Sequence, residues 1–177
     1  MTRPELMQRI VEQAVLRGTF TLRSGRTSNY YLDKYLLSCQ PSVLRSIATG
    51  LAERIDVAAV NRLAGAELGG IPLVTAVALE TGLPCVFVRN QRKDYGTSHQ
   101  IEGRLEDNDR VLLIEDVATT GGQAIEAAGD LAEAGATVVG ILAVIDRLEG
   151  ARENVEAAGY PFDALFTVSE LGLIDGS

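Results

Sequence analysis

The feature that most constrains the fold is an alternation of short apolar runs with stretches of helical periodicity between residues 57 and 167. Uninterrupted apolar runs are typical of strands that are buried on both faces of a sheet. They predict strands at 60–64, 85–88, 111–115, 137–145 and 163–167, with helices at 71–81, 122–134 and 149–158. Because parallel strands need crossover helices, the sequence predicts an α/β fold with a mostly parallel central sheet flanked by helices.

The first 40 residues predict a separate covering element. Thr2 and Glu5 have the spacing of a capping box, and apolar residues then follow one helical face until residue 18. Residues 18–38 are rich in β-formers on both sides of a Ser-Gly turn, which indicates a hairpin. We expect this small N-terminal helix and hairpin, residues 1–40, to form a hood over a ligand held by the sheet. Three residues are expected to pack beneath the hood: Tyr35, Leu36 and Leu37.

Composition limits the function. The 177 residues are enough for one domain with a sizeable core, and 46% of them are hydrophobic. The formal charge of −8 argues against nonspecific nucleic-acid binding, which needs a basic face. No apolar run has the length of a membrane span and the N-terminus lacks the pattern of a signal peptide, so we expect a cytoplasmic protein. Cys39 and Cys85 predict neither a disulfide framework nor a metal site, and both are expected in the core.

The strongest candidate site follows the predicted strand 111–115. Glu115 and Asp116 end the apolar run, and residues 119–122, Thr-Thr-Gly-Gly, precede the next helix. Free backbone N–H groups and the positive end of the helix dipole bind anions at such a place, and glycine lets backbone approach a phosphate closely. The two carboxylates would repel a phosphate, which predicts ribose hydroxyls or a divalent cation as their partner. Neither the Walker pattern nor GxGxxG is present.

Three further groups of candidate residues follow predicted strands: 64–70, Arg89 onward, and the pair at 146–147. In open α/β sheets, ligands bind at the carboxyl ends of the strands. Residues 89–109 contain few apolar side chains but hold the densest basic cluster of the chain, Arg89, Arg92 and Lys93. A segment of this kind is usually functional or disordered. Because it lies beside a predicted phosphate-binding loop, we expect a mobile lid that brings positive charge onto a bound phosphate group, and the alternative is a solvated hairpin.

These segments resemble the type I phosphoribosyltransferases. VLLIEDVATTGGQA, from Val111, is similar to the signature with which that family binds phosphoribosyl pyrophosphate (PRPP). In addition, FTLRSGRTSNYYLD, GAELGGIP, RKDYGT and VIDR resemble the orotate-specific members, from about Phe20 to about Glu149. The resemblance implies one phosphoribosyltransferase domain over 1–177, with the core sheet at 57–167 and a catalytic lid at 89–109. It also implies an enzyme of pyrimidine biosynthesis that joins orotate to PRPP, giving orotidine 5′-monophosphate and pyrophosphate.

The resemblance assigns functions to single residues. Lys93, Arg89 and Asp116 are implied as catalytic, with Arg92 as a further cation beside the leaving pyrophosphate. PRPP binding is implied for Arg89, Lys93, Tyr95, Glu115, Asp116, Val117, Ala118, Thr119, Thr120, Gly121, Gly122 and Gln123. A pyrophosphate turn is implied at Glu67, Leu68 and Gly69. Orotate binding is implied for Arg23, Tyr30, Tyr31, Thr119 and Arg147, and a guanidinium suits the planar carboxylate of orotate. For Arg147 the alternative is a surface ion pair with Asp146 or Glu149.

The implied cofactor is Mg²⁺, held mainly by PRPP, with Glu115 and Asp116 as ligands through water. The implied assembly is a homodimer with shared active sites, and neither nucleic acid nor a membrane is expected as a partner. The chain departs from the family pattern at Gly69 and Asn90, where lysine is usual, and at Tyr95, where histidine is frequent. Two alternatives stay open: a phosphoribosyltransferase for another base, and a noncatalytic PRPP-binding regulator, which Gly69 and Asn90 would fit.

Overall fold

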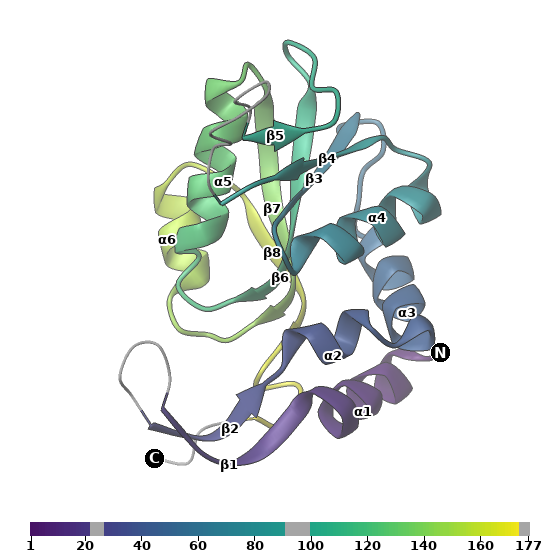
Figure 1. The fold of residues 1–177 in the computed structure, drawn as a ribbon, viewed down its shortest axis with the longest axis vertical. Coiled ribbons are helices and arrows are strands. Elements are labelled where there is room, and N and C mark those ends of the chain that lie inside the picture. Colours follow the sequence, from purple (N-terminus) through teal and green to yellow (C-terminus); the bar gives the residue numbers. More distant parts are fainter. Residues whose placement is uncertain (22–26, 91–99, 174–177) are drawn as a thin grey trace.

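The structure is a computed structural model that describes residues 1–21, 27–90 and 100–173. Its centre is a six-stranded sheet with the strand order β5-β4-β3-β6-β7-β8 (Figure 1). Neighbouring strands from β4 to β8 are parallel, and β5 pairs with β4 in the antiparallel direction. The strands are β3 (Arg62–Ala66), β4 (Cys85–Val88), β5 (Ile101–Glu102), β6 (Arg110–Ala118), β7 (Thr137–Asp146) and β8 (Phe162–Thr167). The predicted α/β fold with a mostly parallel sheet is therefore confirmed.

Helices cover both faces of the sheet (Figure 1). α3 (Pro41–Ala52) and α4 (Gly70–Thr81) lie on one face, and α5 (Gly122–Glu133) and α6 (Ala151–Ala157) lie on the other. Successive residues of β7 serve the two faces in turn, because Leu142 packs in the cluster with α3 and α4 whereas Ile141 packs in the cluster with α5 and α6. This explains why the strand is apolar at consecutive positions. No helix within the described ranges combines the length and the apolar character needed to cross a membrane.

The N-terminal segment forms two helices and a hairpin beside the main sheet (Figure 1). These elements are α1 (Arg3–Ala14), β1 (Val15–Thr21), β2 (Thr27–Leu32) and α2 (Lys34–Ser38). Thr2 and Glu5 form the predicted capping box. The helix ends earlier than the helical spacing predicts, because Val15 pairs with Leu32 in the hairpin ladder. The predicted hairpin is also too long, since residues 34–38 are helical.

Several expectations about packing are wrong. Of the three residues expected beneath the hood, Leu37 is buried, but Tyr35 and Leu36 are 43% and 36% exposed. A helix of one and a half turns buries one side only, so its other residues turn away from the core. Cys39 follows this short helix and is exposed, whereas Cys85 is half-buried and packs against the core, as expected.

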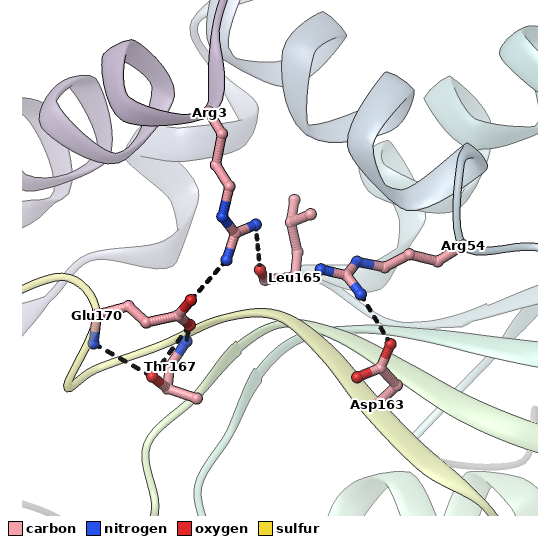
Figure 2. A network of polar contacts seen from close by, with 6 residues as sticks. All are labelled: Arg3, Arg54, Asp163, Leu165, Thr167 and Glu170. Carbon is pink, nitrogen blue, oxygen red and sulfur yellow. Dashed lines mark hydrogen bonds and ion pairs between the residues drawn. The ribbon is translucent and has the colours of Figure 1, made fainter.

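A network of polar contacts ties α1 to the end of β8 (Figure 2). The Arg3 guanidinium donates to the carbonyl oxygen of Leu165 at 2.9 Å and pairs with Glu170 at 2.7 Å. Glu170 also accepts a hydrogen bond from the backbone N–H of Thr167 at 2.8 Å, which holds the pKa of its carboxyl below the ordinary value. The N-terminal segment is therefore anchored to the sheet through residues near the opposite end of the chain.

Candidate functional site

The candidate site lies at the edge where four neighbouring strands end. In spatial order these strands are β4, β3, β6 and β7. β4 leads into Arg89, β3 into the turn 66–70, β6 into the loop 119–121, and β7 into Arg147. The predicted placement of these four segments at one edge is confirmed, as expected for the ligand site of a parallel sheet. The chemical functions of the individual residues stay predictions at this point.

The loop between β6 and α5 has the geometry of an anion-binding turn. Gly121 has a φ of 78°, and a Cβ at this position would meet Cγ2 of Val155 at 2.8 Å. The side-chain amide of Asn154 donates to the carbonyl oxygen of Thr120 at 2.9 Å and fixes the loop to α6. Because the first N–H groups of a helix lack intrahelical partners, this place suits a phosphate. The loop lines a pocket of about 70 Å³ formed by Glu115, Val117, Ala118, Thr119, Thr120, Gly121, Gly122, Gln123 and Ala124.

The two acidic residues lie near the end of β6 and are almost fully buried. Oε1 of Glu115 accepts a hydrogen bond from the backbone N–H of Asp116 at 3.1 Å, whereas Oε2 of Glu115 has no hydrogen-bond partner among the described residues. Burial, reinforced by the neighbouring charge of Asp116, raises the pKa of Glu115 to about 8. A buried carboxyl oxygen without a partner is a position that a ligand hydroxyl or a water molecule can satisfy.

Sequence reasoning missed Lys34, the first residue of α2. Its Nζ lies 2.9 Å from Oδ2 and 3.2 Å from Oδ1 of Asp116. Burial opposes the charge of Lys34, but the carboxylates of Asp116 and Glu115 outweigh burial and raise its pKa. One signal could have pointed to it, because lysine occurs only twice in the sequence, at Lys34 and Lys93.

The predicted pyrophosphate turn after β3 lies directly beside Asp116. A Cβ on Gly69 would lie 1.6 Å from Oδ2 of Asp116, so the carboxylate of Asp116 lies directly against the backbone of the turn. Oε1 of Glu67 accepts a hydrogen bond from the backbone N–H of Asn90 at 2.8 Å, which joins the turn to the segment after β4. Leu68 is 62% exposed. None of the three turn side chains supplies a positive charge.

Arg147 presents a partly unpaired guanidinium at the end of β7. Its side chain is only 9% exposed, and Cζ lies 5.4 Å from the ring centroid of Tyr30. Nε donates to Oε1 of Glu149 at 2.9 Å, so one of the two ion pairs considered as the alternative does form. Nη2 is buried and has no hydrogen-bond partner among the described residues. A guanidinium with one nitrogen paired and another unpaired can still bind a planar carboxylate.

Tyr31 and Thr119, two further residues predicted to face orotate, are both exposed. The Tyr31 ring lies 5.7 Å from the ring of Phe20 on the paired strand of the hairpin. Thr119 follows the last residue of β6. Neither residue is committed to the core, so both side chains are accessible to a ligand.

The described parts of the predicted lid are its two ends. The backbone N–H of Arg89 donates to the carbonyl oxygen of Gln100 at 2.8 Å, and residues 101–102 form β5 against β4, a pairing that the sequence does not predict. Nη1 of Arg89 lies 3.6 Å from Oε1 of Glu102. Four predicted site residues lie outside the described residues: Arg23, Arg92, Lys93 and Tyr95.

Taken together, the edge offers three kinds of partner to a ligand. The loop 119–122 suits a phosphate, the acidic pair suits vicinal hydroxyls, and Arg147 suits a second, acidic molecule. The first two lie on β6 and its loop, and the third lies at the end of the adjacent strand β7. The arrangement can therefore hold a sugar phosphate and an anionic acceptor side by side.

Known proteins resemble this chain over most of its length. Residues 40–158 match the model of the phosphoribosyl transferase domain. The orotate phosphoribosyltransferase of Pyrococcus horikoshii is 46% identical over 170 residues, which cover 94% of this chain and 91% of that protein. The orotate phosphoribosyltransferase of Halobacterium salinarum is 49% identical over 158 residues, which cover 89% of this chain and 89% of that protein. The crystal structure of Mycobacterium tuberculosis orotate phosphoribosyltransferase in complex with PRPP has a TM-score of 0.81 at 31% identity, over 97% of this chain and 99% of that one. The chain therefore belongs to the phosphoribosyltransferase family and, within it, to the orotate phosphoribosyltransferases.

Proposed function

We propose that the chain transfers the phosphoribosyl group of PRPP to orotate, giving orotidine 5′-monophosphate and pyrophosphate in pyrimidine biosynthesis. The observation that carries the proposal is the adjacency, at neighbouring strand ends, of the acidic pair Glu115 and Asp116, the amide-lined loop 119–122, and the partly unpaired Arg147. A sugar phosphate and an anionic base satisfy all three groups at once. Membership of the orotate phosphoribosyltransferases supports the choice of orotate as that base.

The ribose phosphate of PRPP is placed along β6 and its loop. Its 5′-phosphate accepts hydrogen bonds from the backbone at the start of α5, with the hydroxyls of Thr119 and Thr120 as further donors. Its ribose hydroxyls donate to Glu115 and Asp116, and Oε2 of Glu115 has no competing partner among the described residues. Such donors favour the ionised form of a buried carboxyl, so PRPP binding lowers the pKa of Glu115.

Orotate is placed between the hairpin and the end of β7. Nη2 of Arg147 donates to the orotate carboxylate while Nε keeps its bond to Glu149. The Tyr30 ring holds the guanidinium in position from the hairpin side, with Arg23 as a second cation. Because orotate is already an anion at neutral pH, attack on the anomeric carbon needs no strong base. The rate then depends on alignment of the two reactants and on stabilisation of the leaving group.

The departing pyrophosphate is placed against the turn 67–69. The turn offers backbone groups but no cationic side chain. Positive charge comes instead from the segment 89–109, with Arg89, Arg92 and Lys93 as the cations and Tyr95 as an additional donor. We assign this segment as a lid that closes over the reacting centre and excludes water.

The donor set fits a Mg²⁺ ion held mainly by the substrate. Within the described residues no group of three or more His, Cys, Asp or Glu side chains is arranged to hold a metal ion. The oxygen donors at hand are the carboxyl groups of Glu115 and Asp116, which suit Mg²⁺ through its retained water molecules. When bound, the ion neutralises charge on the pyrophosphate group.

We further propose a cytoplasmic homodimer with shared active sites, in which residues 1–40 act as the hood. Exposed apolar side chains on the N-terminal segment, among them Leu16, Tyr35 and Leu36, support a surface that a second copy covers. Sedimentation equilibrium of the purified protein tests the assembly. A mass equal to one chain at micromolar concentration would remove the shared-site arrangement.

An optical assay of orotate consumption with PRPP and Mg²⁺ tests the proposed reaction. Orotate should disappear only when PRPP is present, with release of one pyrophosphate for each orotate consumed. Uracil, xanthine and adenine serve as rival bases. Turnover of one of these without turnover of orotate would make the chain a phosphoribosyltransferase for another base. PRPP binding by calorimetry without turnover of any base would make it a regulator.

Lys93→Ala tests the assigned lid. Because Lys93 is placed on the leaving group, the variant should lose turnover far more than it loses affinity for orotate. Single-turnover kinetics and orotate titration measure the two effects separately. Unchanged turnover would remove the segment 89–109 from the mechanism.

A further inference from the structure

One ion pair connects the N-terminal segment to the acidic end of β6. Nζ of Lys34 lies 2.9 Å from Oδ2 of Asp116, and the Asp116 side chain is only 5% exposed. We propose that Lys34 is a further positioning residue of the PRPP site, an inference that rests on the proposed function. Its ammonium group keeps the Asp116 carboxylate against the backbone of Gly69. In that orientation the carboxylate accepts hydrogen bonds from the ribose hydroxyls.

The charge balance of the site supports this assignment. Asp116 follows Glu115 directly, so two nearly buried carboxyl groups lie at consecutive positions. Among the described residues, Lys34 is the cationic side chain that forms an ion pair with Asp116. The Lys34 side chain is 32% exposed, whereas that of Asp116 is nearly buried. Removing the partner of a buried carboxylate leaves its charge uncompensated, so the carboxylate reorients or draws in water. Without Lys34, the Asp116 carboxylate would lose its defined position.

The packing around Oδ2 of Asp116 narrows that position further. The same oxygen is 2.9 Å from the Lys34 ammonium and 1.6 Å from the Cβ that Gly69 lacks. The carboxylate oxygen that fills the space of a residue-69 side chain is therefore the same oxygen that pairs with Lys34, which comes from a different element. Residues 66–70, Ala-Glu-Leu-Gly-Gly, carry no cation of their own. Lys34 thus supplies a positive charge to the carboxylate that lies against this turn.

A short stretch of chain connects Lys34 to the orotate end of the site. Residues 30–34 run from the end of β2 into α2. Tyr30, at the start of this stretch, packs on Arg147, and Lys34, at its end, pairs with Asp116. The backbone N–H of Asp33 donates to the carbonyl oxygen of Ala14 at 2.8 Å, which fixes the stretch to α1. Lys34 is thereby held by a scaffold that does not depend on bound PRPP.

Steady-state kinetics of Lys34→Met, with Lys34→Arg as the conservative variant, tests the proposal. The KM for PRPP should rise about 10-fold or more in Lys34→Met, while the KM for orotate changes less than about 2-fold. Lys34→Arg should restore most of the PRPP affinity, because arginine can also pair with a carboxylate. Arg45→Met, which removes one exposed positive charge from α3, should leave both constants unchanged. An equal rise in both KM values, or a Lys34→Met enzyme with wild-type kinetics, would overturn the proposal.

Amine acetylation of the wild-type enzyme provides a readout that does not depend on any variant folding or on turnover. The chain has two lysines, so peptide mass spectrometry can follow Lys34 and Lys93 separately. PRPP with Mg²⁺ should slow acetylation of Lys34 several-fold, whereas orotate alone should not. A Lys34 acetylation rate that is insensitive to PRPP, in an enzyme that binds PRPP by calorimetry, would overturn the proposal. Failure of PRPP to bind at all would instead overturn the proposed function.

Discussion

Oδ2 of Asp116 occupies the place where a side chain of residue 69 would begin, 1.6 Å from a Cβ built on Gly69. The backbone of Gly69, with φ −70° and ψ −29°, is open to any residue, so Asp116 and not the backbone requires glycine here. We predict that Gly69→Ala displaces the Asp116 carboxylate and lowers PRPP affinity about 10-fold or more. Isothermal titration calorimetry measures the affinity, and thermal unfolding should show that the fold persists.

Gly129→Ala in α5 is the matched control for this substitution. A Cβ on Gly129 meets no atom within 4 Å, and alanine in a helix interior should add about 0.5–1 kcal/mol of stability. PRPP affinity should be unchanged in this variant. If Gly69→Ala also binds PRPP as tightly as the wild type, Asp116 does not contact the ribose.

The loop 119–122, which we propose binds the 5′-phosphate, allows effects on folding and on binding to be separated at two adjacent glycines. Gly121→Ala should cost about 1–3 kcal/mol of folding free energy, because φ is 78° and the new Cβ would lie 2.8 Å from Cγ2 of Val155. Gly122→Ala meets only Oγ1 of Thr120, at 3.8 Å, so its stability should stay near the wild-type value. Its affinity for PRPP should nevertheless fall, because the methyl group covers backbone on which the 5′-phosphate is placed. Urea unfolding measures the stability, and calorimetry measures the PRPP affinity. Undiminished PRPP affinity in Gly122→Ala would show that the 5′-phosphate does not bind at this backbone.

Arg147 should be more sensitive to replacement by lysine than a similar arginine outside the site. Arg147→Lys keeps the charge but loses the planar fork, so the KM for orotate should rise about 10-fold or more with a smaller change in kcat. Arg152 is the matched control, since it also lies over an aromatic ring, at 5.2 Å, and pairs with Glu156 at 3.2 Å. Arg152→Lys should leave both constants unchanged. Equal effects of the two substitutions would indicate that Arg147 acts on the fold and not on orotate.

The parts of the site that could be predicted from the sequence are those that local sequence determines. The apolar run of β6, the two acids and the glycines at the start of α5 follow one another directly, and each needs only its neighbours to form. The meeting of the strand ends could also be predicted, because the carboxyl ends of parallel strands lie at one edge of the sheet. The boundary of α1 could not, because pairing of Val15 with Leu32 overrides its helical spacing. β5 could not either, because a two-residue strand exists only through its partner β4.

Lys34 illustrates the other limit of sequence reasoning. Its partner Asp116 is 82 positions away, and no periodicity or motif links the two residues. The partly unpaired state of Arg147 is equally invisible, since it depends on which nitrogen reaches Glu149. The ion pair of Lys34 follows from tertiary packing of the N-terminal segment against the strand ends, whereas the state of Arg147 follows from the conformation of two side chains at the end of β7. For this site, local sequence predicts the groups proposed to bind the phosphate, and the contacts of Lys34 and Arg147 are visible only in the structure.

The buried pair between Arg62 and Asp109 predicts a defined pH dependence of stability at the start of β6. The side chains are 12% and 8% exposed. Burial raises the pKa of Asp109, but hydrogen bonds from the backbone N–H of Glu106 and from Arg62 outweigh it and lower the pKa below 3.8. A lowered pKa in the folded state means that the ionised carboxyl stabilises the fold at pH values above the pKa of the unfolded state. This contribution is lost only as the pH falls through the folded-state pKa.

Asp109→Asn should therefore cost about 1–3 kcal/mol of folding free energy, equally at pH 7 and pH 5, because Arg62 loses its partner. Asp107→Asn, at the exposed neighbouring acid, should cost little at either pH. Urea unfolding of the three proteins checks this, and a gap between wild type and Asp109→Asn that already narrows from pH 7 to pH 5 would show that Asp109 titrates as an ordinary surface carboxyl.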